Sequence, residues 1–476
     1  MAACRSSTSD VTYPPTIIPL STSIAPTELD IAPETPILGR EITPKQSLQL
    51  DNPFLVTQFQ PLRSSDLSDN RMGDMITLHP SIHTERPDEL ADRISEKGLK
   101  WMRLSYDVFD WNEVEQRGAY SIAAIDSVKD QAIATLSEEG IQIIYTLVFW
   151  DPDIDLTGDD FSRFSREQEI DAFLEYVRFI VGHLKGQIRY YALLNEPNIG
   201  EGSQQFVDVE NYIALMEAVV PVIRSEDPEA GIIVGEVTPL NEAGAYDYLM
   251  AIITSPTIRL VDGISWHLSN GASPEYQADF YYRYPDLVRE IQSVAKEHGF
   301  NGEYFGTEMH WRTSETPHTS EYWGYSLTTA AKYLARGIVT NLGLDCYAGL
   351  AENLEDPPKM RVIQNLSTLM DQAGALDIPV DLESDALNLI TYGFIRPNGD
   401  RLLAIWQDTS AEDRLAGELV AISFSDTDIQ KIIGFDVING IQQEMLITFR
   451  DGKASMENVL VKDYPIIFLL KGVEAE

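Results

Sequence analysis

The chain reads IQIIYTLVFW at 141–150, IDAFLEYVRFIVGHL at 170–184 and IRYYALLNEP at 188–197. The first and third segments are short apolar runs rich in β-branched and aromatic residues, which is typical of strands that are buried on both faces. The middle segment has apolar residues three and four positions apart, as in a helix that packs one face on a core. The three segments therefore predict a buried strand, a helix and a second buried strand.

The same alternation of strand and helix patterns extends from residue 74 to residue 380. Eight apolar runs carry it, at 75–80, 101–106, 141–150, 188–197, 231–237, 261–268, 302–309 and 344–350. Eight strands that alternate with helices predict an α/β fold, a closed parallel TIM (β/α)8 barrel. An open doubly wound sheet is the alternative, but it would need a glycine-rich turn after the first strand, and the sequence has none there.

From residue 381 to residue 476 the apolar period changes to two. Strand-like segments such as DRLLAIWQD (400–408) are separated by the turn signals Asn398-Gly399, Asn439-Gly440 and Asp451-Gly452. This pattern predicts an appended C-terminal antiparallel β-sandwich. Residues 47–73 lead into the barrel, and we expect them either to be a simple connection or to add strands to the sandwich.

Residues 1–46 are rich in proline, serine and threonine and have no apolar period, so we predict a disordered linker. Ala2-Ala3-Cys4 resembles what remains of a bacterial lipoprotein cleavage site, which would make Cys4 a lipid anchor. The protein would then be extracellular or bound to the cell envelope. The alternative is an arbitrary start to a disordered tail and a cytoplasmic location. No run of about 18 apolar residues occurs, so the sequence predicts no membrane span.

The charge balance argues against several classes of partner. The chain has 75 acidic and 35 basic residues, a net charge of −40, which repels nucleic acid and anionic membrane surfaces. Its two cysteines, Cys4 and Cys346, belong to no Cys/His cluster, so a structural zinc site is not expected. We predict no metal and no cofactor.

Two glutamates stand where a barrel of this kind carries its catalytic groups, at the carboxyl ends of strands. Asn195-Glu196 ends the fourth predicted strand and Thr307-Glu308 ends the seventh, 112 positions after Glu196. A single glutamate at a strand end is more often a salt-bridge partner. Two of them across one barrel mouth match retaining glycoside hydrolysis, in which carboxyl groups about 5–5.5 Å apart flank the bond that is cleaved.

At this point the chain resembles the clan A glycoside hydrolases over residues 74–375. The resemblance lies in Asn195-Glu196-Pro197-Asn198, in Glu308 and in RLSYDVFDWNEVEQRGAYSIAAIDSVKDQAIATLSEEGIQIIYTL (103–147). With the appended sandwich, the chain loosely resembles glycoside hydrolase family 39, which contains β-xylosidases and α-iduronidases. The resemblance implies a retaining glycosidase that acts on β-linked oligo- or polysaccharides, with a β-xylosidase-like exo action favoured. It makes Glu196 the general acid/base and Glu308 the nucleophile.

The resemblance also implies roles for three neighbours of the glutamates. Asn195 would bind the sugar 2-hydroxyl, Arg103 would keep the nucleophile ionised, and His267 would lie at the rim of the site. Two departures leave the substrate open, because both positions normally shape the sugar pocket. Ser269 stands where the family has a tyrosine, and CYAGLAEN (346–353) lacks a tryptophan that is common there.

Three tryptophans, Trp150, Trp266 and Trp311, end the third, sixth and seventh predicted strands. Tryptophans at one rim are expected to be platforms on which sugar rings stack, although each could instead be a core residue. His310 is a further candidate for substrate binding. His310 and His79 are equally compatible with packed histidines.

Two alternatives to an exo-glycosidase stay open. One is an endo-acting β-glycanase or a transglycosylase, which would differ in its loops. The other is a catalytically inactive carbohydrate-binding surface protein, although the presence of both carboxylates argues against it.

Overall fold

A computed structural model describes residues 47–52, 56–75, 86–104, 125–148, 163–200, 206–313, 324–351, 354–414, 417–425, 429–450 and 453–472. Within these ranges no helix combines the length and the apolar character that crossing a bilayer requires. The predictions for Cys4 and for the linker at 1–46 lie outside the described residues.

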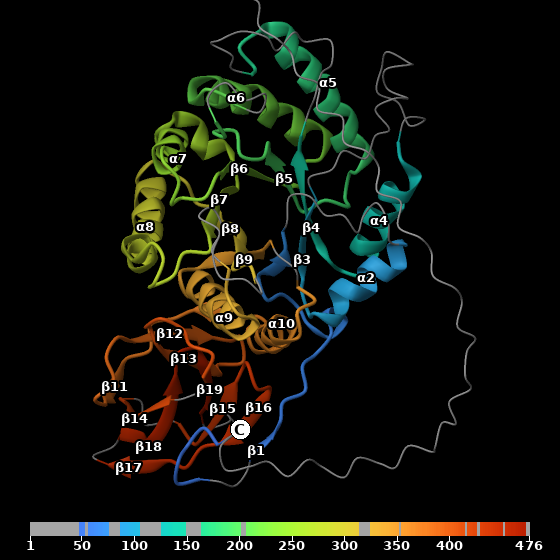
Figure 1. The fold of residues 1–476 in the computed structure, drawn as a ribbon. Helices are drawn as coiled ribbons and strands as arrows, with labels where there is room; N and C mark the ends of the chain where they lie inside the picture. The colour runs from blue at the N-terminus through green and yellow to red at the C-terminus, as the bar shows by residue number, and fades with distance from the viewer. Residues whose placement is uncertain are drawn as a thin grey trace, which may run out of the picture. The chain divides into compact units, whose positions relative to one another are not determined.

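Eight parallel strands of the described chain close into a barrel, which confirms the predicted fold class (Figure 1). Each strand pairs with the next in chain order, and the last pairs with the first. The strands are β2 (Met72–Asp74), β3 (Trp101–Leu104), β4 (Gln142–Leu147), β5 (Tyr190–Leu193), β6 (Gly231–Val237), β7 (Gly263–Asn270), β8 (Glu303–His310) and β9 (Cys346–Leu350).

One helix follows each barrel strand in the described chain, as the alternating pattern predicted. These helices are α2 (Pro87–Glu96), α4 (Ser127–Glu138), α5 (Glu167–His183), α6 (Val209–Glu226), α7 (Ala245–Thr254), α8 (Ala278–Glu297), α9 (Leu327–Gly343) and α10 (Pro357–Leu369). Two short 3-10 helices, η2 (Ser64–Asp66) and η4 (Pro256–Leu260), lie in connections.

The first barrel strand differs from its prediction. We placed it at 75–80, whereas β2 is Met72–Asp74 and residues 76–80 lie outside the described chain. The predicted strand began after β2 because MITL (75–78) is apolar, whereas Gly73 and Asp74 are poor strand formers. Gly73 is needed here, since a Cβ at this position would lie 2.7 Å from the Cβ of Trp101.

Aromatic side chains fill the amino end of the barrel interior. The ring of Tyr347 stacks on Phe305 at 4.3 Å and meets Trp101 edge-on at 4.9 Å between centroids. The hydroxyls of Tyr190 and Tyr347 both donate to the Glu303 carboxylate. This packed plug closes one end of the barrel and leaves the carboxyl end of the strands for polar side chains.

The C-terminal strands form two antiparallel sheets, as the period of two predicted. One has seven strands in the order β1-β16-β15-β19-β13-β12-β10, and the other has four in the order β11-β14-β18-β17. Their bounds are β1 (Val56–Gln58), β10 (Gly374–Ala375), β11 (Val380–Glu383), β12 (Leu389–Ile395), β13 (Arg401–Gln407), β14 (Gly417–Phe424), β15 (Lys431–Asp436), β16 (Ile441–Glu444), β17 (Thr448–Arg450), β18 (Lys453–Lys462) and β19 (Ile466–Lys471).

The segment before the barrel contributes to this sandwich. Strand β1 pairs antiparallel with β16, with Val56 opposite Gln443. Strand β1 is thus an edge strand of the seven-stranded sheet. The glycines of two predicted turns, Gly399 and Gly440, adopt the left-handed conformation that such turns require.

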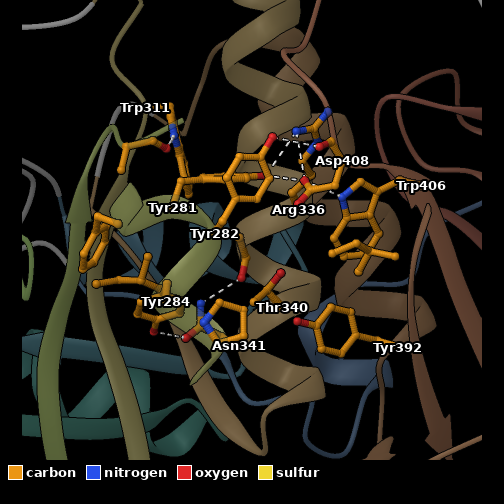
Figure 2. A pocket seen from close by; sticks show the side chains of 16 residues that line it. Tyr281, Tyr282, Tyr284, Trp311, Arg336, Thr340, Asn341, Tyr392, Trp406 and Asp408 are labelled. Carbon is orange, nitrogen blue, oxygen red and sulfur yellow. Dashed lines mark hydrogen bonds and ion pairs between the residues drawn. The ribbon is translucent and has the colours of Figure 1, made fainter. Parts of the chain in front are cut away.

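Helix α9 connects the barrel to the sandwich through buried charges. Arg336 donates to the backbone carbonyl of Asp463 at 2.6 Å and pairs with Asp408 at 3.3 Å. Lys332 binds the Asp463 carboxylate at 2.7 Å. Beside these contacts lies a cavity of about 590 Å³, part of it open to solvent, lined mainly by aromatic side chains of α8, β12 and β13 and by α9 (Figure 2).

Candidate active site

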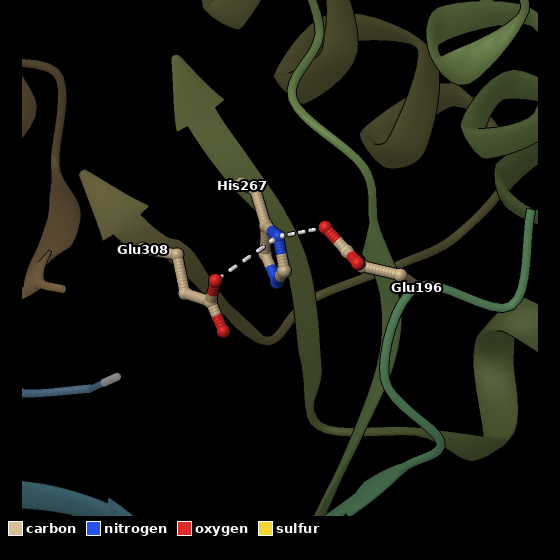
Figure 3. Close-up of side chains that lie close together, drawn as sticks. All are labelled: Glu196, His267 and Glu308. Atoms are coloured by element: carbon tan, nitrogen blue, oxygen red, sulfur yellow. Dashed lines mark hydrogen bonds and ion pairs between the residues drawn. The ribbon is translucent and has the colours of Figure 1, made fainter. Parts of the chain in front are cut away.

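Three side chains converge at the carboxyl end of the barrel. Figure 3 shows Glu196 after β5, His267 on β7 and Glu308 on β8 pointing toward one another. Nδ1 of His267 lies 3.1 Å from Oε1 of Glu196 and 3.6 Å from Oε2 of Glu308. One carboxylate oxygen of each glutamate and one imidazole nitrogen all lie within 4.8 Å of one another.

The backbone at both glutamates is strained. Glu196 and Glu308 each have φ of 45°, in the left-handed region that residues other than glycine rarely adopt. The pairing of β8 with β9 also shifts register between Gly306 and Met309, which is the mark of a bulge at Glu308. Bulges and strained residues of this kind redirect side chains and are concentrated at functional sites.

Arg103 on β3 contacts both Glu308 and Asn195, the residue before Glu196. Its guanidinium is fully buried and donates from Nη1 to Oε1 of Glu308 at 2.6 Å. Nε donates to the Thr146 hydroxyl at 3.2 Å, and Nη2 donates to the side-chain oxygen of Asn195. Burial alone would lower the pKa of Arg103, but nearby carboxylates, including Glu308, raise it above its usual value. Arg103 therefore stays charged and orients both Glu308 and Asn195.

His267 is almost completely buried among charged groups. Burial alone would lower its pKa, but the charge of Glu308 and the hydrogen bond with Glu196 outweigh burial and raise the pKa to about 9. The imidazole is therefore protonated at neutral pH, and both of its ring nitrogens are donors.

A third carboxylate, Glu236 on β6, was not identified from the sequence. It has no exposed surface, and its Oε2 lies 2.7 Å from Nη2 of Arg103 and 3.7 Å from Nε2 of His267. Burial alone would raise the pKa of Glu236, but Arg103 and His267 lower it overall. Its position near the carboxyl end of the predicted strand GIIVGEV (231–237) is the feature of the sequence that indicates a place in the site.

Glu196, His267 and Glu308 each offer one atom that could bind a metal ion, and these three atoms lie within 4.8 Å of one another. Nδ1 of His267 already lies within hydrogen-bonding distance of Oε1 of Glu196. The Arg103 guanidinium already occupies one carboxylate oxygen of Glu308. These donors therefore suit proton sharing better than the binding of a cation.

Two of the predicted sugar platforms are not at the mouth of the barrel. Trp266 has no exposed surface, and its indole N–H donates to the Tyr284 hydroxyl at 3.2 Å on the helix side of β7. Trp311 is 3% exposed and donates to the carbonyl of Ala272 at 2.9 Å. A sugar cannot stack on Trp266, whose ring has no exposed surface, so the prediction is wrong for that residue, whereas Trp311 lines a cavity whose described lining residues do not include Glu196 or Glu308. The prediction for Trp150 and the remark on His79 lie outside the described residues.

Trp311 instead lines the cavity beside α9 that Figure 2 shows. Glu196, His267 and Glu308 are not among the described residues that line it. His310, at the end of β8, is partly buried, and burial followed by the charges of Arg312 and Lys359 lowers its pKa to about 4. His310 is therefore neutral at physiological pH, and its role in substrate binding stays a prediction.

No family model and no curated protein sequence matches the chain. Solved structures do match its fold. A family 39 glycoside hydrolase from the gut symbiont Bacteroides cellulosilyticus WH2 has a TM-score of 0.61 at 15% identity, over 87% of this chain and 83% of that one. A conserved exported protein from Bacteroides fragilis has a TM-score of 0.56 at 12% identity, over 87% and 98% of the two chains.

The catalytic domain of the GH30 xylanase C from Talaromyces cellulolyticus is also similar, with a TM-score of 0.54 at 12% identity, over 87% of this chain and 98% of that one. At these identities the likeness concerns the fold. The expectation drawn from the sequence is confirmed at that level: this chain has the fold of solved glycoside hydrolases, family 39 among them.

Proposed function

We propose that the protein is a retaining glycoside hydrolase that cleaves β-glycosidic bonds by double displacement, with Glu308 as nucleophile and Glu196 as general acid/base. The observation that supports this most is the approach of their carboxylate oxygens to within 4.8 Å. Retaining enzymes have carboxyl groups about 5–5.5 Å apart, whereas inverting enzymes need about 6.5–9.5 Å to hold a water between them.

In the first step, Glu308 attacks the anomeric carbon of the sugar. The bond from this carbon to the leaving oxygen breaks, and that oxygen takes the proton of Glu196, so a glycosyl ester forms on Glu308. The 2.6 Å hydrogen bond from Arg103 orients the attacking carboxylate. Asn195, itself held by Arg103, would donate its amide N–H to the sugar 2-hydroxyl.

In the second step, Glu196 acts as a base. It takes a proton from water, the water oxygen attacks the anomeric carbon, and the ester bond to Glu308 breaks. His267 assists because its protonated imidazole donates to Oε1 of Glu196, which leaves the other oxygen for the transferred proton. Two displacements at one carbon return the sugar in its original β configuration.

We infer xylan-type β-glycans as the substrate class, with an exo action as in β-xylosidases. The folds of a family 39 enzyme and of a xylanase support this choice, and it extends beyond what a shared fold establishes. We infer a location outside the cytoplasm, which the export of a protein with the same fold supports. The lipid anchor at Cys4 stays a prediction.

The test is hydrolysis of a panel of aryl β-glycosides and plant polysaccharides, with the anomer of the first product identified by NMR. We expect turnover with the β-anomer released first. An α-anomer as first product would exclude double displacement, and no turnover by a folded protein that binds glycans would favour the inactive carbohydrate-binding alternative.

A further inference from the structure

Glu236 lies directly behind the residues of the proposed mechanism, yet no step above uses it. A buried carboxylate is unfavourable by several kcal/mol unless it is paired, and an apolar side chain would fill this part of a barrel without that penalty. Its neighbours are the two cations of the site, Arg103 and His267. A structural role alone does not explain why a charge lies here.

The backbone of Glu236 repeats the features of the two proposed catalytic residues. Its φ is 48°, and the pairing of β6 with β7 shifts register between Val234 and Val237. Its N–H donates to the Ser265 hydroxyl at 2.9 Å, and its carbonyl accepts the N–H of Glu196 at 2.8 Å. Glu236 thus has the bulged, left-handed geometry of Glu308 and is bonded through its backbone to Glu196.

Arg103 and His267 each lie between Glu236 and one of the two proposed catalytic carboxylates. Arg103 directs Nη2 to Glu236 and Nη1 to Glu308. Nε2 of His267 lies 3.7 Å from Oε2 of Glu236, an ion-pair contact without a hydrogen bond, and Nδ1 lies 3.1 Å from Oε1 of Glu196. Tyr212 of α6 faces the same carboxylate from behind, but its hydroxyl is already bonded to Gly235 and to the carbonyl of Leu193. Among the described residues, the groups that lower the pKa of Glu236 are the two cations and the hydroxyl of Ser265.

We propose that Glu236 is a positioning residue whose carboxylate anchors Arg103 and His267 so that they present Nη1 to Glu308 and Nδ1 to Glu196. This inference rests on the proposed function, because it assigns those two glutamates to catalysis.

Charge balance gives the reason for a third carboxylate. Before the reaction, with Glu196 protonated, Glu308 and Glu236 are the two anions paired with Arg103 and His267, while Glu242 is a further carboxyl group that interacts electrostatically with His267. In the glycosyl ester Glu308 is neutral, Glu196 is ionised, and the anions are Glu196 and Glu236. Glu236 thus keeps the cluster neutral at both stages, which matters because a net charge is unfavourable in a buried site.

The test compares Glu236→Gln with a matched control, Asp436→Asn. Asp436 is also fully buried and paired with a cation, Lys462 at 2.7 Å, but it lies in the sandwich. We expect Glu236→Gln to lower kcat roughly 100-fold with little change in KM, because the catalytic groups lose their alignment. Asp436→Asn should leave kcat and its pH profile as in the wild type, even where it lowers the melting temperature.

A second readout needs no substrate. NMR titration of the His267 ring, assigned with His267→Gln, should show that the imidazolium loses its proton about one pH unit lower in Glu236→Gln, and not in Asp436→Asn. An inactive wild type would overturn the proposed function while this titration still tests the contact. If Glu236→Gln keeps wild-type kcat and titration, the proposal is overturned.

Should Glu236→Gln fail to fold, Glu236→Asp replaces it. This variant keeps the charge but withdraws the carboxylate from Arg103 by about one methylene. We expect its pH profile to match the wild type while kcat falls, and full activity would contradict a positioning role.

Discussion

Nη1 of Arg103 donates a 2.6 Å hydrogen bond to Oε1 of Glu308, which joins the second strand of the barrel to the seventh. This contact is supported from other directions, because Arg103 also donates to the backbone carbonyl of Met75, the Thr146 hydroxyl and the Asn195 side chain and pairs with the Glu236 carboxylate. A guanidinium held this firmly gives Glu308 a single orientation toward the mouth of the barrel.

Arg103→Lys should lower kcat/KM by about 100-fold, because an ammonium group cannot donate to Glu308 and Asn195 and also pair with Glu236 in the planar geometry of a guanidinium. The measurement is the initial rate on an aryl β-glycoside. Arg163→Lys is the matched control, since Arg163 is another buried arginine paired with a glutamate, Glu169 at 3.2 Å. Equal losses in both variants would mean that Arg103 acts only through stability.

The raised pKa of His267 predicts a loss of stability at alkaline pH. The unfolded-state value is 6.5 and the folded-state value is about 9, so protonation of His267 stabilises the fold fully below pH 6.5. This contribution is lost as the pH rises from 6.5 through 9. Urea unfolding between pH 6 and pH 10 should show a decline in the wild type that is absent in His267→Gln. An identical decline in both proteins would assign it to other groups.

The lowered pKa of His310 predicts that the free energy of unfolding falls at acid pH. Its folded-state pKa is lowered to about 4, below the unfolded value of 6.5. The unfolded chain therefore takes up a proton first, and stability falls as the pH drops from 6.5 toward 4. His310→Gln should reduce this decline in urea unfolding measured at pH 7, 6, 5 and 4. A wild-type dependence in that variant would mean that other groups cause the decline at acid pH.

Trp266→Ala should destabilise the protein by about 3–5 kcal/mol, the usual range for removing a large buried aromatic side chain. Trp266→Phe should be milder and leave KM unchanged, because the ring faces α8 and has no surface at the mouth. Chemical denaturation and steady-state kinetics of the same preparations check both statements. A raised KM with unchanged stability would restore the sugar-stacking role.

The two proposed catalytic glutamates could be predicted from the sequence because chain spacing fixes which strand ends in which residue. The direction of a side chain within a strand is harder to predict. Trp266 and His267 are neighbours on β7, and neighbouring side chains on a strand point to opposite faces. Since His267 faces the site, Trp266 must face the helices. Two adjacent residues of one strand cannot both face the site, and a prediction based only on position at the strand end does not take this into account.

Glu236 escaped prediction for a different physical reason. Regular alternation along GIIVGEV does not reveal a bulge, and the register shift between Val234 and Val237 is what turns this carboxylate toward Arg103. Neither a bulge nor a left-handed glutamate has a local sequence signature. Glu236 does lie near the carboxyl end of a barrel strand, which is where polar residues of the site are expected.

Azide rescue of the two alanine variants tests the assignment of Glu308 and Glu196 most directly. With an aryl β-glycoside whose leaving group needs no protonation, Glu196→Ala should still form the glycosyl ester, and azide should release it as a β-glycosyl azide of retained configuration. Glu308→Ala should be inactive alone, and any azide product should be the inverted α-glycosyl azide. The account predicts retention for Glu196→Ala, as read by NMR of the product. Retention in the azide product of Glu308→Ala, together with inversion in the azide product of Glu196→Ala, would contradict the assignment, because the two roles would then be exchanged.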